Sequence, residues 1–279
     1  MSTNNIESIK TVLITGANAG LGKECARQLA LQDGVEKIYL GCRNEAKAKA
    51  AQRELEEATG KSIFEIVIVD VSNLDSVRGV VETLPEPIDA LVMNAGGMVG
   101  QTLGEKTNYG VIQLFSVNVL GHVVLLEELL EAKKLTKVAL YAGSEAARGI
   151  PQMNVKRPAL KTSSVDEFTS ICDGSFFGDK IDPMTAYGAV KYMAAMWVAA
   201  VARKHPDVRI ITMSPGGTSG TEFVDDLPPG MKFMFKYIAL PLMPLFGLMH
   251  GIDVGAKRYV DGLTDKSYES GVFYSHKRH

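Results

Sequence analysis

Short runs of apolar, mostly β-branched residues alternate along the chain with longer segments in which apolar residues recur every three or four positions. The short runs have the length of strands, and their near-continuous apolar character is typical of a parallel sheet that is covered on both faces. The longer segments have the spacing of amphipathic helices. We expect strands at Lys10–Thr15, Lys37–Leu40, Ile63–Val69, Ile88–Met93, Val138–Tyr141, Val208–Met213 and Gly271–Tyr274. We expect helices at Leu21–Gln32, Glu45–Ala58, Leu74–Thr83, Val111–Ala132 and Ala186–Lys204.

This alternation predicts an α/β fold, a doubly wound parallel sheet of about seven strands with helices on both faces. Neither a repeat nor a linker rich in Pro, Gly or Ser divides the 279 residues, so we expect a single Rossmann-fold domain over residues 1–279. Two irregular segments interrupt the pattern, an insert at about 148–184 and an apolar segment at about 214–251. Loops of this length in a compact domain are usually functional, and we expect the second to be a substrate lid.

Composition and charge narrow the classes of protein to which the chain can belong. Hydrophobic residues make up 46% of the chain and charged residues 22%, which excludes a disordered protein. The formal charge of −2 gives no basic excess, so we expect no nucleic-acid partner. The apolar run Tyr237–Ile252 is too short and too interrupted by prolines to cross a membrane, so we expect no transmembrane segment. Three separated cysteines and a polar N-terminus exclude a disulfide framework and a cysteine zinc site, and they predict a cytoplasmic protein.

A glycine-rich turn directly follows the first predicted strand and opens the first predicted helix. Its sequence is TGANAGLG at 15–22, in which glycines allow a tight turn and a close approach of the backbone to a pyrophosphate at the helix N-terminus. Glu24 follows Gly22-Lys23 where a P-loop needs Ser or Thr, so this turn is not a P-loop. The alternative is a plain tight turn between strand and helix.

The end of the second predicted strand bears on the choice of cofactor. It carries Arg43 and no acid, and an arginine suits the 2′-phosphate of NADP(H) where an acid would favour NAD(H). The alternative is an arginine that only meets solvent. We expect NADP(H) in preference to NAD(H).

Tyr187 and Lys191 form the pattern Y-x-x-x-K, which places a phenol and an ammonium group on one face of a helix. A tyrosine with an ordinary pKa is a poor acid at neutral pH, and a neighbouring cation lowers that pKa. Such a pair often occurs by chance, so it gains weight only from the motifs that accompany it.

These motifs together resemble the short-chain dehydrogenase/reductase family over nearly the whole chain. The matches run in the family's order: TGANAGLG at 15–22, Asp70, Asn94-Ala95-Gly96, Asn118 in SVNVLGH, Ser144, Tyr187 with Lys191, and Ser214-Pro215-Gly216. The segments GCRN and VNVLGH further resemble the branch that contains the retinol dehydrogenases and the protochlorophyllide oxidoreductases.

The resemblance implies a hydride-transfer site. Tyr187 would be the general acid and base, Lys191 would lower its pKa, Ser144 would bind the substrate oxygen, and Asn118 would anchor a water near Lys191. It implies no metal ligands. The cofactor-binding residues that it implies are Gly16, Asn18, Ala19, Gly20, Leu21, Gly22, Arg43, Asp70, Val71, Asn94, Ala95, Gly96, Tyr187, Lys191, Pro215, Gly216, Gly217 and Thr218, with Thr221 as an alternative to Thr218.

Several of these residues also have simpler interpretations. Asn118 could be an asparagine that satisfies a core helix, Ser144 a turn residue, and Asp70 a helix N-cap. His122, which lies near Asn118, is expected at the surface of its helix rather than in the site.

The implied function is an NADP(H)-dependent oxidoreductase (EC 1.1.1.-) that interconverts a carbonyl and an alcohol. The apolar residues at 233–249, among them Met234, Phe235, Leu242 and Phe246, indicate a lipophilic small-molecule substrate. The alternatives are a reductase of a carbon–carbon double bond and a sensor that binds NADP(H) without turnover. Peripheral membrane contact through the apolar segment is compatible with each of these.

The insert also bears on oligomeric state. Relatives of this family pair through two long helices, which correspond here to Val111–Ala132 and Ala186–Lys204. Ser144 precedes Tyr187 by 43 positions (187 − 144), and in monomeric carbonyl reductases of the family a long insert at this place covers the dimer surface. We therefore expect a monomer in preference to a homodimer.

Overall fold

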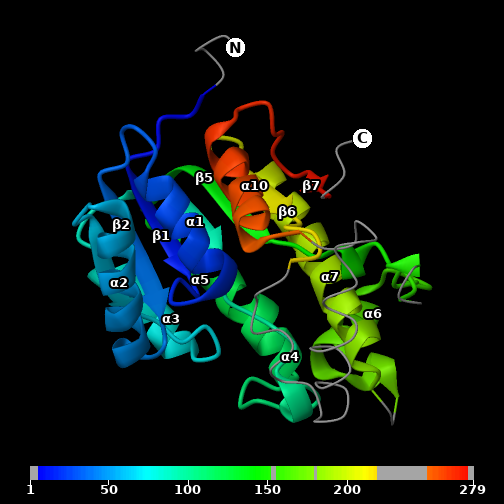
Figure 1. The fold of residues 1–279 in the computed structure, drawn as a ribbon. Coiled ribbons are helices and arrows are strands. Elements are labelled where there is room, and N and C mark those ends of the chain that lie inside the picture. Colours follow the sequence, from blue (N-terminus) through cyan, green and yellow to red (C-terminus); the bar gives the residue numbers. More distant parts are fainter. Residues whose placement is uncertain (1–5, 152–154, 179–180, 219–249, 276–279) are drawn as a thin grey trace.

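The computed structural model describes residues 6–151, 155–178, 181–218 and 250–275. In these residues seven strands form one sheet in the order β3-β2-β1-β4-β5-β6-β7, and all neighbouring pairs are parallel (Figure 1). The predicted doubly wound α/β fold is thereby confirmed. The strands are β1 (Thr11–Thr15), β2 (Lys37–Cys42), β3 (Phe64–Ile68), β4 (Ile88–Met93), β5 (Leu135–Ala142), β6 (Arg209–Met213) and β7 (Phe273–Tyr274).

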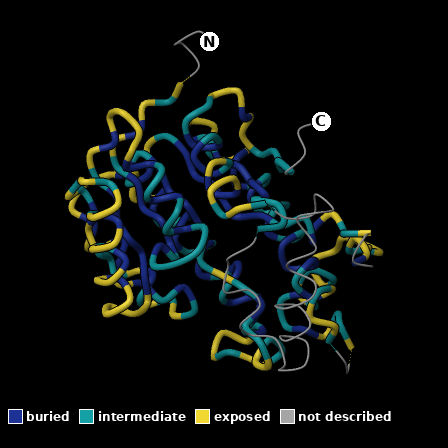
Figure 2. The backbone as a smooth tube through the Cα atoms, in the orientation of Figure 1, coloured by how far each residue is buried: buried dark blue, intermediate teal, exposed yellow. Residues whose placement is uncertain are grey.

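Helices cover both faces of the sheet. On one face lie α1 (Gly20–Ala30), α2 (Glu45–Thr59) and α10 (Ile252–Thr264), and on the other lie α3 (Leu74–Thr83), α5 (Gly121–Glu131) and α7 (Pro183–Lys204). Because successive strand residues point to opposite faces, Leu13 joins one apolar core while its neighbours Val12 and Ile14 join the other. Figure 2 shows the buried residues along the sheet and on the inner faces of the helices.

The helix predicted at Val111–Ala132 consists of three pieces. They are the short α4 (Gln113–Phe115), a π-helical turn at Ser116–Leu120 and α5. Single π-helical turns occur mostly inside α-helices and frequently at functional sites. Here the turn contains Asn118, one of the predicted site residues.

The insert contains regular structure that the sequence pattern did not predict. Its helix α6 (Val165–Asp173) begins at Ser164, whose side chain accepts a hydrogen bond from Glu167 N, and ends at Gly174 in the left-handed conformation. Ile171 is fully buried, and the Ile112 N–H donates to Cys172 O at 2.8 Å. The insert thus packs on the segment before α4. The apolar residues of the insert that pack against the same core include Leu160, Phe168, Phe176, Phe177 and Ile181, and Met193 and Trp197 of α7 pack against it too.

Short 3-10 helices complete the secondary structure of the described residues. They are η2 (Gly100–Thr102), η4 (Glu145–Ala147) and η6 (Ser175–Phe177).

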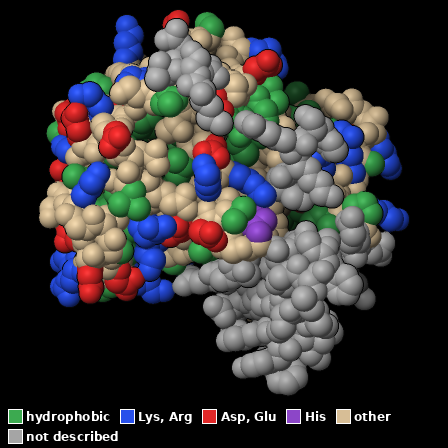
Figure 3. Space-filling model, turned by 45° about the horizontal axis from the view of Figure 1, so that its top comes forward, with side chains coloured by type: hydrophobic (Ala, Val, Ile, Leu, Met, Phe, Trp, Pro, Cys, Tyr) green, Lys and Arg blue, Asp and Glu red, His purple; other side chains and the backbone are tan. Residues whose placement is uncertain are grey.

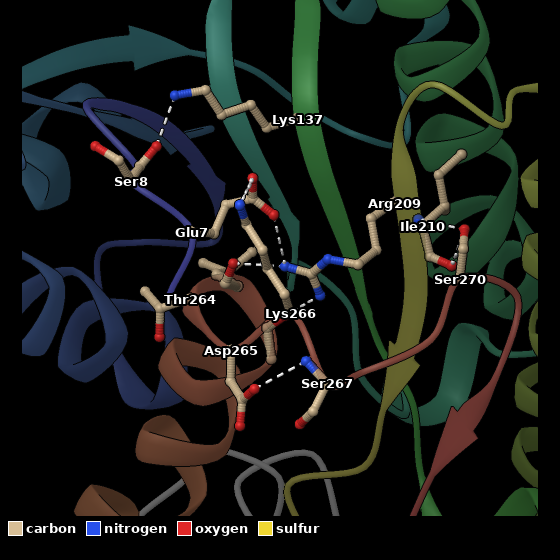
Figure 4. Close-up of polar contacts among 12 residues, drawn as sticks. Glu7, Ser8, Lys137, Arg209, Ile210, Thr264, Asp265, Lys266, Ser267 and Ser270 are labelled. Carbon is tan, nitrogen blue, oxygen red and sulfur yellow. Dashed lines mark hydrogen bonds and ion pairs between the residues drawn. The ribbon is translucent and has the colours of Figure 1, made fainter. Parts of the chain in front are cut away.

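The amino ends of β5 and β6 carry a cluster of polar contacts around Arg209 (Figure 4). The Arg209 guanidinium donates to Gly262 O and to Leu263 O, both at 2.7 Å, in the last turn of α10. It also lies 3.4 Å from one carboxylate oxygen of Glu7, and the ammonium of Lys266 lies 3.9 Å from the other. A cation at a helix C-terminus is favourable, so Arg209 joins α10 and the segment around Glu7 to the sheet.

Two further observations concern the outside of the molecule. Figure 3 shows acidic and basic side chains interspersed over the face in view. Among the described residues, the continuous helical stretch Gln113–Glu131 is long and apolar enough to span a membrane, and 61% of it is buried inside the protein. Helices in the core of a globular domain meet the same criteria, so this is weak evidence of a membrane span. Of the lid predicted at about 214–251, residues 219–249, which include Thr221, lie outside the described residues.

Candidate active site

The glycine-rich turn and the Asn94–Gly96 loop meet at the carboxyl edge of the sheet. β1 lies between β2 and β4, and the helices that follow β1 and β4 go to opposite faces. In open α/β sheets, ligands bind where the strand order reverses in this way. The fold therefore places the predicted cofactor residues at its one topological switch point within the described sheet.

The backbone of the glycine-rich turn excludes side chains at two positions. Gly16 has φ +67°, and a Cβ there would lie 3.0 Å from Ala95 Cα. A Cβ at Gly22 would collide with the carbonyl oxygen of Gly16 and with the side chain of Asn94. The turn can therefore fold only because glycine occupies both positions.

Asn94 and Thr15 fasten the turn to the loop that follows β4. The Asn94 side-chain amide donates to Thr15 O at 3.0 Å and to Gly16 O at 3.3 Å. The Thr15 hydroxyl oxygen accepts from Asn94 N at 2.9 Å and from Ala95 N at 3.0 Å. The Asn94 side chain thus fixes the conformation of the glycine-rich turn.

The turn has the properties of an anion site. α1 begins after Ala19 with no side-chain cap and with no acid in its first turn, so the positive end of the helix lacks an anionic partner there. Gly20 has φ +57°, and a Cβ there would meet no atom within 4 Å. This open space above an uncapped helix end fits the pyrophosphate of a dinucleotide.

Arg43 and Asp70 stand at the ends of two neighbouring strands. Arg43 is exposed directly after β2, and it forms no ion pair with any residue in the described ranges. Asp70 accepts from Ser72 N at 2.9 Å and from Ser72 Oγ at 2.7 Å. The N-cap of α3 is Asn73, so the alternative role of Asp70 as that helix cap is wrong. Val71, which follows Asp70, is buried.

Asn118 connects the π-helical turn to the loop that follows β4. Its side-chain oxygen accepts from Gly97 N at 3.1 Å, and its amide donates to Gly97 O at 2.8 Å and to Leu114 O at 2.9 Å. The side chain is therefore fully used in fixing the loop beside Gly96. Only the backbone carbonyl of Asn118 is directed toward the catalytic group, as described below.

Ser144 and Tyr187 lie together because a glycine lets two elements approach closely. Ser144 follows β5 and caps η4, its hydroxyl accepting from Ala146 N at 3.2 Å. A Cβ at Gly188 would come within 2.7 Å of Ala146 O, so only glycine lets α7 lie so near η4. Burial raises the pKa of Tyr187 to about 12, and a hydrogen bond with Ser144 acts in the opposite direction.

Lys191 is buried below Tyr187 and faces another tyrosine. Its ammonium donates to Ala142 O at 2.9 Å and to the Tyr141 hydroxyl at 3.2 Å, and it lies 5.6 Å from the centre of the Tyr187 ring. Burial lowers the pKa of Lys191 to about 7. The expected lowering of the Tyr187 pKa by Lys191 is not found here, because burial dominates for both groups.

His122 is not at the surface, and that prediction was wrong. It is fully buried between two site residues, with Nε2 3.1 Å from Thr15 Oγ1 and Nδ1 3.2 Å from Asn118 O. Burial lowers the pKa of His122 to about 4, so the imidazole is neutral at neutral pH. It holds the π-helical turn against β1 as a hydrogen-bonding core residue.

The loop after β6 completes the edge. Gly216 has φ +81°, and its N–H donates to the hydroxyl of the buried Ser214 at 3.2 Å. Thr218 pairs with His250 in an isolated parallel bridge. A Cβ at Gly255 of α10 would lie within 3.4 Å of Leu21, Thr218 and His250. Thr218 therefore lies near Leu21 in the first turn of α1.

Sequence reasoning missed Thr15, Tyr141 and the role of His122. Each is buried in the network that supports the site rather than at its open side. His122 follows Asn118 by four positions on one helix, which places the two on the same face. That spacing was the one signal in the sequence for their association.

Comparisons with known proteins find relatives described as short chain dehydrogenases and retinol dehydrogenases. A family model described as short chain dehydrogenase matches residues 10–140. Mouse retinol dehydrogenase 12 is 37% identical over 128 residues, which are 45% of this chain and 39% of that protein. The chain thus spans about two fifths of the length of that relative. A short chain dehydrogenase of Hypocrea virens, virL, is 27% identical over 95% of this chain and 76% of its own length.

Solved structures share the fold at low sequence identity. The L-sorbose reductase of Gluconobacter frateurii, complexed with NADPH and L-sorbose, has a TM-score of 0.70 at 20% identity and covers 96% of this chain and 95% of its own. An NADPH-bound carbonyl reductase from chicken fatty liver has a TM-score of 0.64 at 17% identity, with 96% and 97% covered.

Proposed function

Since the chain belongs to the short-chain dehydrogenase/reductase family, in a branch like that of the retinol dehydrogenases, we propose that it is an oxidoreductase that acts on carbonyl and alcohol groups. One observation carries the proposal. Tyr187, Ser144 and Lys191 converge at the same edge of the sheet as the glycine-rich turn. An acid group, a hydroxyl donor and an uncapped helix N-terminus that suits an anion are thereby combined at one edge of the sheet.

Each of these residues has a separate role in the proposed reduction of a carbonyl group. NADPH, when bound, supplies the hydride. The hydroxyl of Ser144 donates a hydrogen bond to the carbonyl oxygen of the substrate and stabilises the charge that develops there. Tyr187 gives its proton to that oxygen, and the reverse reaction returns the proton to the tyrosine. Stabilising the tyrosinate that remains is the role that the family resemblance implies for Lys191.

NADP(H) is the cofactor that the residues favour. The exposed guanidinium of Arg43 at the end of β2 is without an acidic partner in the described part of the chain, so it is available for a 2′-phosphate. Two of the solved structures with this fold are named as NADPH-bound. We propose a lipophilic substrate, which the apolar residues at 233–249 and the relatives named retinol dehydrogenases support.

A substrate panel tests the proposed function. The purified protein is supplied with NADPH or NADH and with aldehydes, steroid ketones, quinones or retinoids, and loss of reduced cofactor is followed by absorbance. We expect turnover with at least one lipophilic carbonyl and a higher kcat/KM with NADPH than with NADH. Cofactor binding without turnover of any carbonyl or alcohol would instead support a sensor.

A further inference from the structure

We propose that Tyr141 is a positioning residue of the active site: its hydroxyl, fixed by the Asn118 carbonyl, holds the ammonium of Lys191 in place beside Tyr187. The inference rests on the proposed function for its consequence in catalysis. It adds a buried residue to the site that neither the motifs nor the comparisons assign.

Tyr141 is held rigidly from three directions. It lies near the carboxyl end of β5, the middle of three paired strands, where it is opposite Met93 of β4 and Thr212 of β6. Its side chain is fully buried. Two rings contact it edge to face, His122 at 6.0 Å and Trp197 at 6.2 Å between centroids. The phenol therefore has one orientation that the core permits.

The hydroxyl of Tyr141 joins two parts of the site. It donates to Asn118 O at 2.9 Å and accepts from Lys191 Nζ at 3.2 Å. The proton of the phenol is therefore engaged with the π-helical turn, and its oxygen is left to accept from the ammonium. The Asn118 carbonyl lies within the π-helical turn, and the Nδ1 of His122 contacts the same oxygen at 3.2 Å.

The ring of Tyr141 stabilises the same ammonium. Lys191 Nζ lies 4.7 Å from the ring centroid, within the range of a cation–π interaction. No carboxylate in the described ranges pairs with Lys191, so the hydroxyl, the ring and the Ala142 carbonyl are what offset its desolvation. Tyr141 thus directly connects Lys191 with the Asn118 carbonyl, and Asn118 is the residue for which the resemblance implied a water near Lys191.

The ionisable groups around Lys191 determine how a substitution of Tyr141 changes the pKa of Lys191. They are Tyr141 on β5, Tyr187 on α7 and the neutral His122 on α5. Removing the Tyr141 hydroxyl takes away an acceptor whose hydrogen bond is stronger with the charged ammonium of Lys191 than with the neutral amine. The pKa of Lys191 must then fall, and the ammonium must be lost at a lower pH.

Tyr141→Phe tests this with two independent measurements. The titration of Lys191 is followed by NMR of 13C-labelled lysine, its signal assigned with Lys191→Met. We expect the midpoint to fall by about one to two pH units, the effect of one hydrogen bond to a charged group. The pH at which kcat for carbonyl reduction declines should fall by the same amount, while the KM for NADPH stays within about twofold of the wild-type value.

Tyr39→Phe is the matched control, since Tyr39 is a buried tyrosine on β2 of the same sheet and outside the site. It should change neither the Lys191 midpoint nor the pH profile. An unchanged Lys191 midpoint in folded Tyr141→Phe would overturn the proposal. The NMR titration needs no substrate, so a wild-type protein that turns over nothing would refute the proposed function and leave the role of Tyr141 decided by the titration.

Discussion

At the scale of single residues, the site depends on side chains whose ordinary protonation is altered by burial. Burial raises the pKa of Tyr187 and lowers those of Lys191 and His122, so each group favours its neutral form. Perturbed titration of several adjacent groups is typical of active sites. The individual contributions can be separated by substitutions that remove one atom or one charge.

Tyr187→Phe removes the proposed acid and leaves the ring. We expect kcat to fall by at least about 100-fold, because general acid catalysis contributes about that much or more. Binding of NADPH, measured by its fluorescence, should be retained, because the phenol acts in the chemical step. Tyr192→Phe, on the same helix, is the control and should stay active. Activity of the Tyr187 variant above a few per cent of wild type would remove this residue as the acid.

Arg43→Ala tests the choice of cofactor. A charge-assisted contact with the 2′-phosphate is worth about 1.5–3 kcal/mol, so affinity for NADPH should fall by about 10- to 100-fold and that for NADH by little. Titration calorimetry with both cofactors measures the two losses. Arg53→Ala, an exposed arginine on α2, should affect neither. Equal losses for both cofactors in the Arg43 variant would contradict a phosphate contact.

Lys191→Met tests how much the burial of the Lys191 ammonium lowers the free energy of unfolding, because this cost depends on pH. The folded-state pKa of about 7 lies below the ordinary lysine pKa of 10.5, so the folded state binds fewer protons than the unfolded state between these values. The penalty of charging Lys191 is fully present below pH 7 and is relieved as pH rises toward 10.5. The stability of Lys191→Met relative to wild type should therefore decrease by on the order of 2 kcal/mol from about pH 7 to about pH 9.

Urea unfolding of both proteins at the two pH values measures this change. Tyrosines that titrate in the same range are common to both proteins, so their contributions cancel in the difference. A stability difference that is the same at both pH values would show that Lys191 stays charged in the fold.

At the scale of secondary-structure elements, the close approach of α7 to η4 sets the catalytic geometry. Gly188→Ala would place a methyl group 2.7 Å from Ala146 O and push Tyr187 away from Ser144. We expect kcat to fall by at least about 10-fold with cofactor affinity nearly unchanged, because small displacements of reacting groups have large effects on rate.

Gly79→Ala in α3 is the matched control for this change. A Cβ there meets no atom within 4 Å, so the variant should be fully active and slightly more stable, by roughly 0.5–1 kcal/mol. Parallel loss of activity in both variants would point to a general effect of alanine and against the local contact.

The sequence predicted those elements whose pattern and ends agree. Leu74–Thr83 and Ile88–Met93 were predicted with the bounds that the structure has, since Asn73 caps the first and Pro85 separates the two. α10 was missed because Gly255 and Gly262 weaken its helical pattern. The structure shows why glycine stands there: a Cβ at Gly262 would lie 2.9 Å from Leu140 and 3.0 Å from Ile211 of the sheet.

The residues of the candidate site likewise include some that the sequence predicts and others that only the fold reveals. Tyr187, Lys191, Ser144 and the glycine-rich turn are visible from sequence because their spacing carries the chemistry. The contact between Tyr141 and Lys191 joins residues fifty positions apart (191 − 141), and only the sheet brings them together. The direction of the Tyr187 pKa was also beyond sequence, because it depends on how deeply the fold buries the phenol.

At the scale of the whole molecule, the packing of the insert bears on assembly. α6 and η6 bury apolar side chains in the same core as Met193 and Trp197 of α7, one of the two helices that the family resemblance implies as a pairing surface. We expect a monomer, because a partner would have to displace these contacts and a stable interface needs above about 1,000 Å².

Sedimentation velocity at micromolar concentration measures the oligomeric state, and serial dilution shows whether any larger species is stable. A dimer that persists on dilution would show that the insert leaves the pairing surface of α7 free.

The packing of α1 on α10 has a consequence for how the chain reaches its fold during synthesis. α1 buries Cys25 and Leu29 in the same core as Tyr259 and Leu263 of α10, and Gln28 donates to Asp253 O at 2.8 Å. The ribosome releases α1 more than two hundred residues before its partner (253 − 28 = 225). The nascent chain therefore exposes the apolar face of α1 that α10 later covers until α10 emerges from the ribosome. During that interval the chain can bind chaperones and is prone to aggregate.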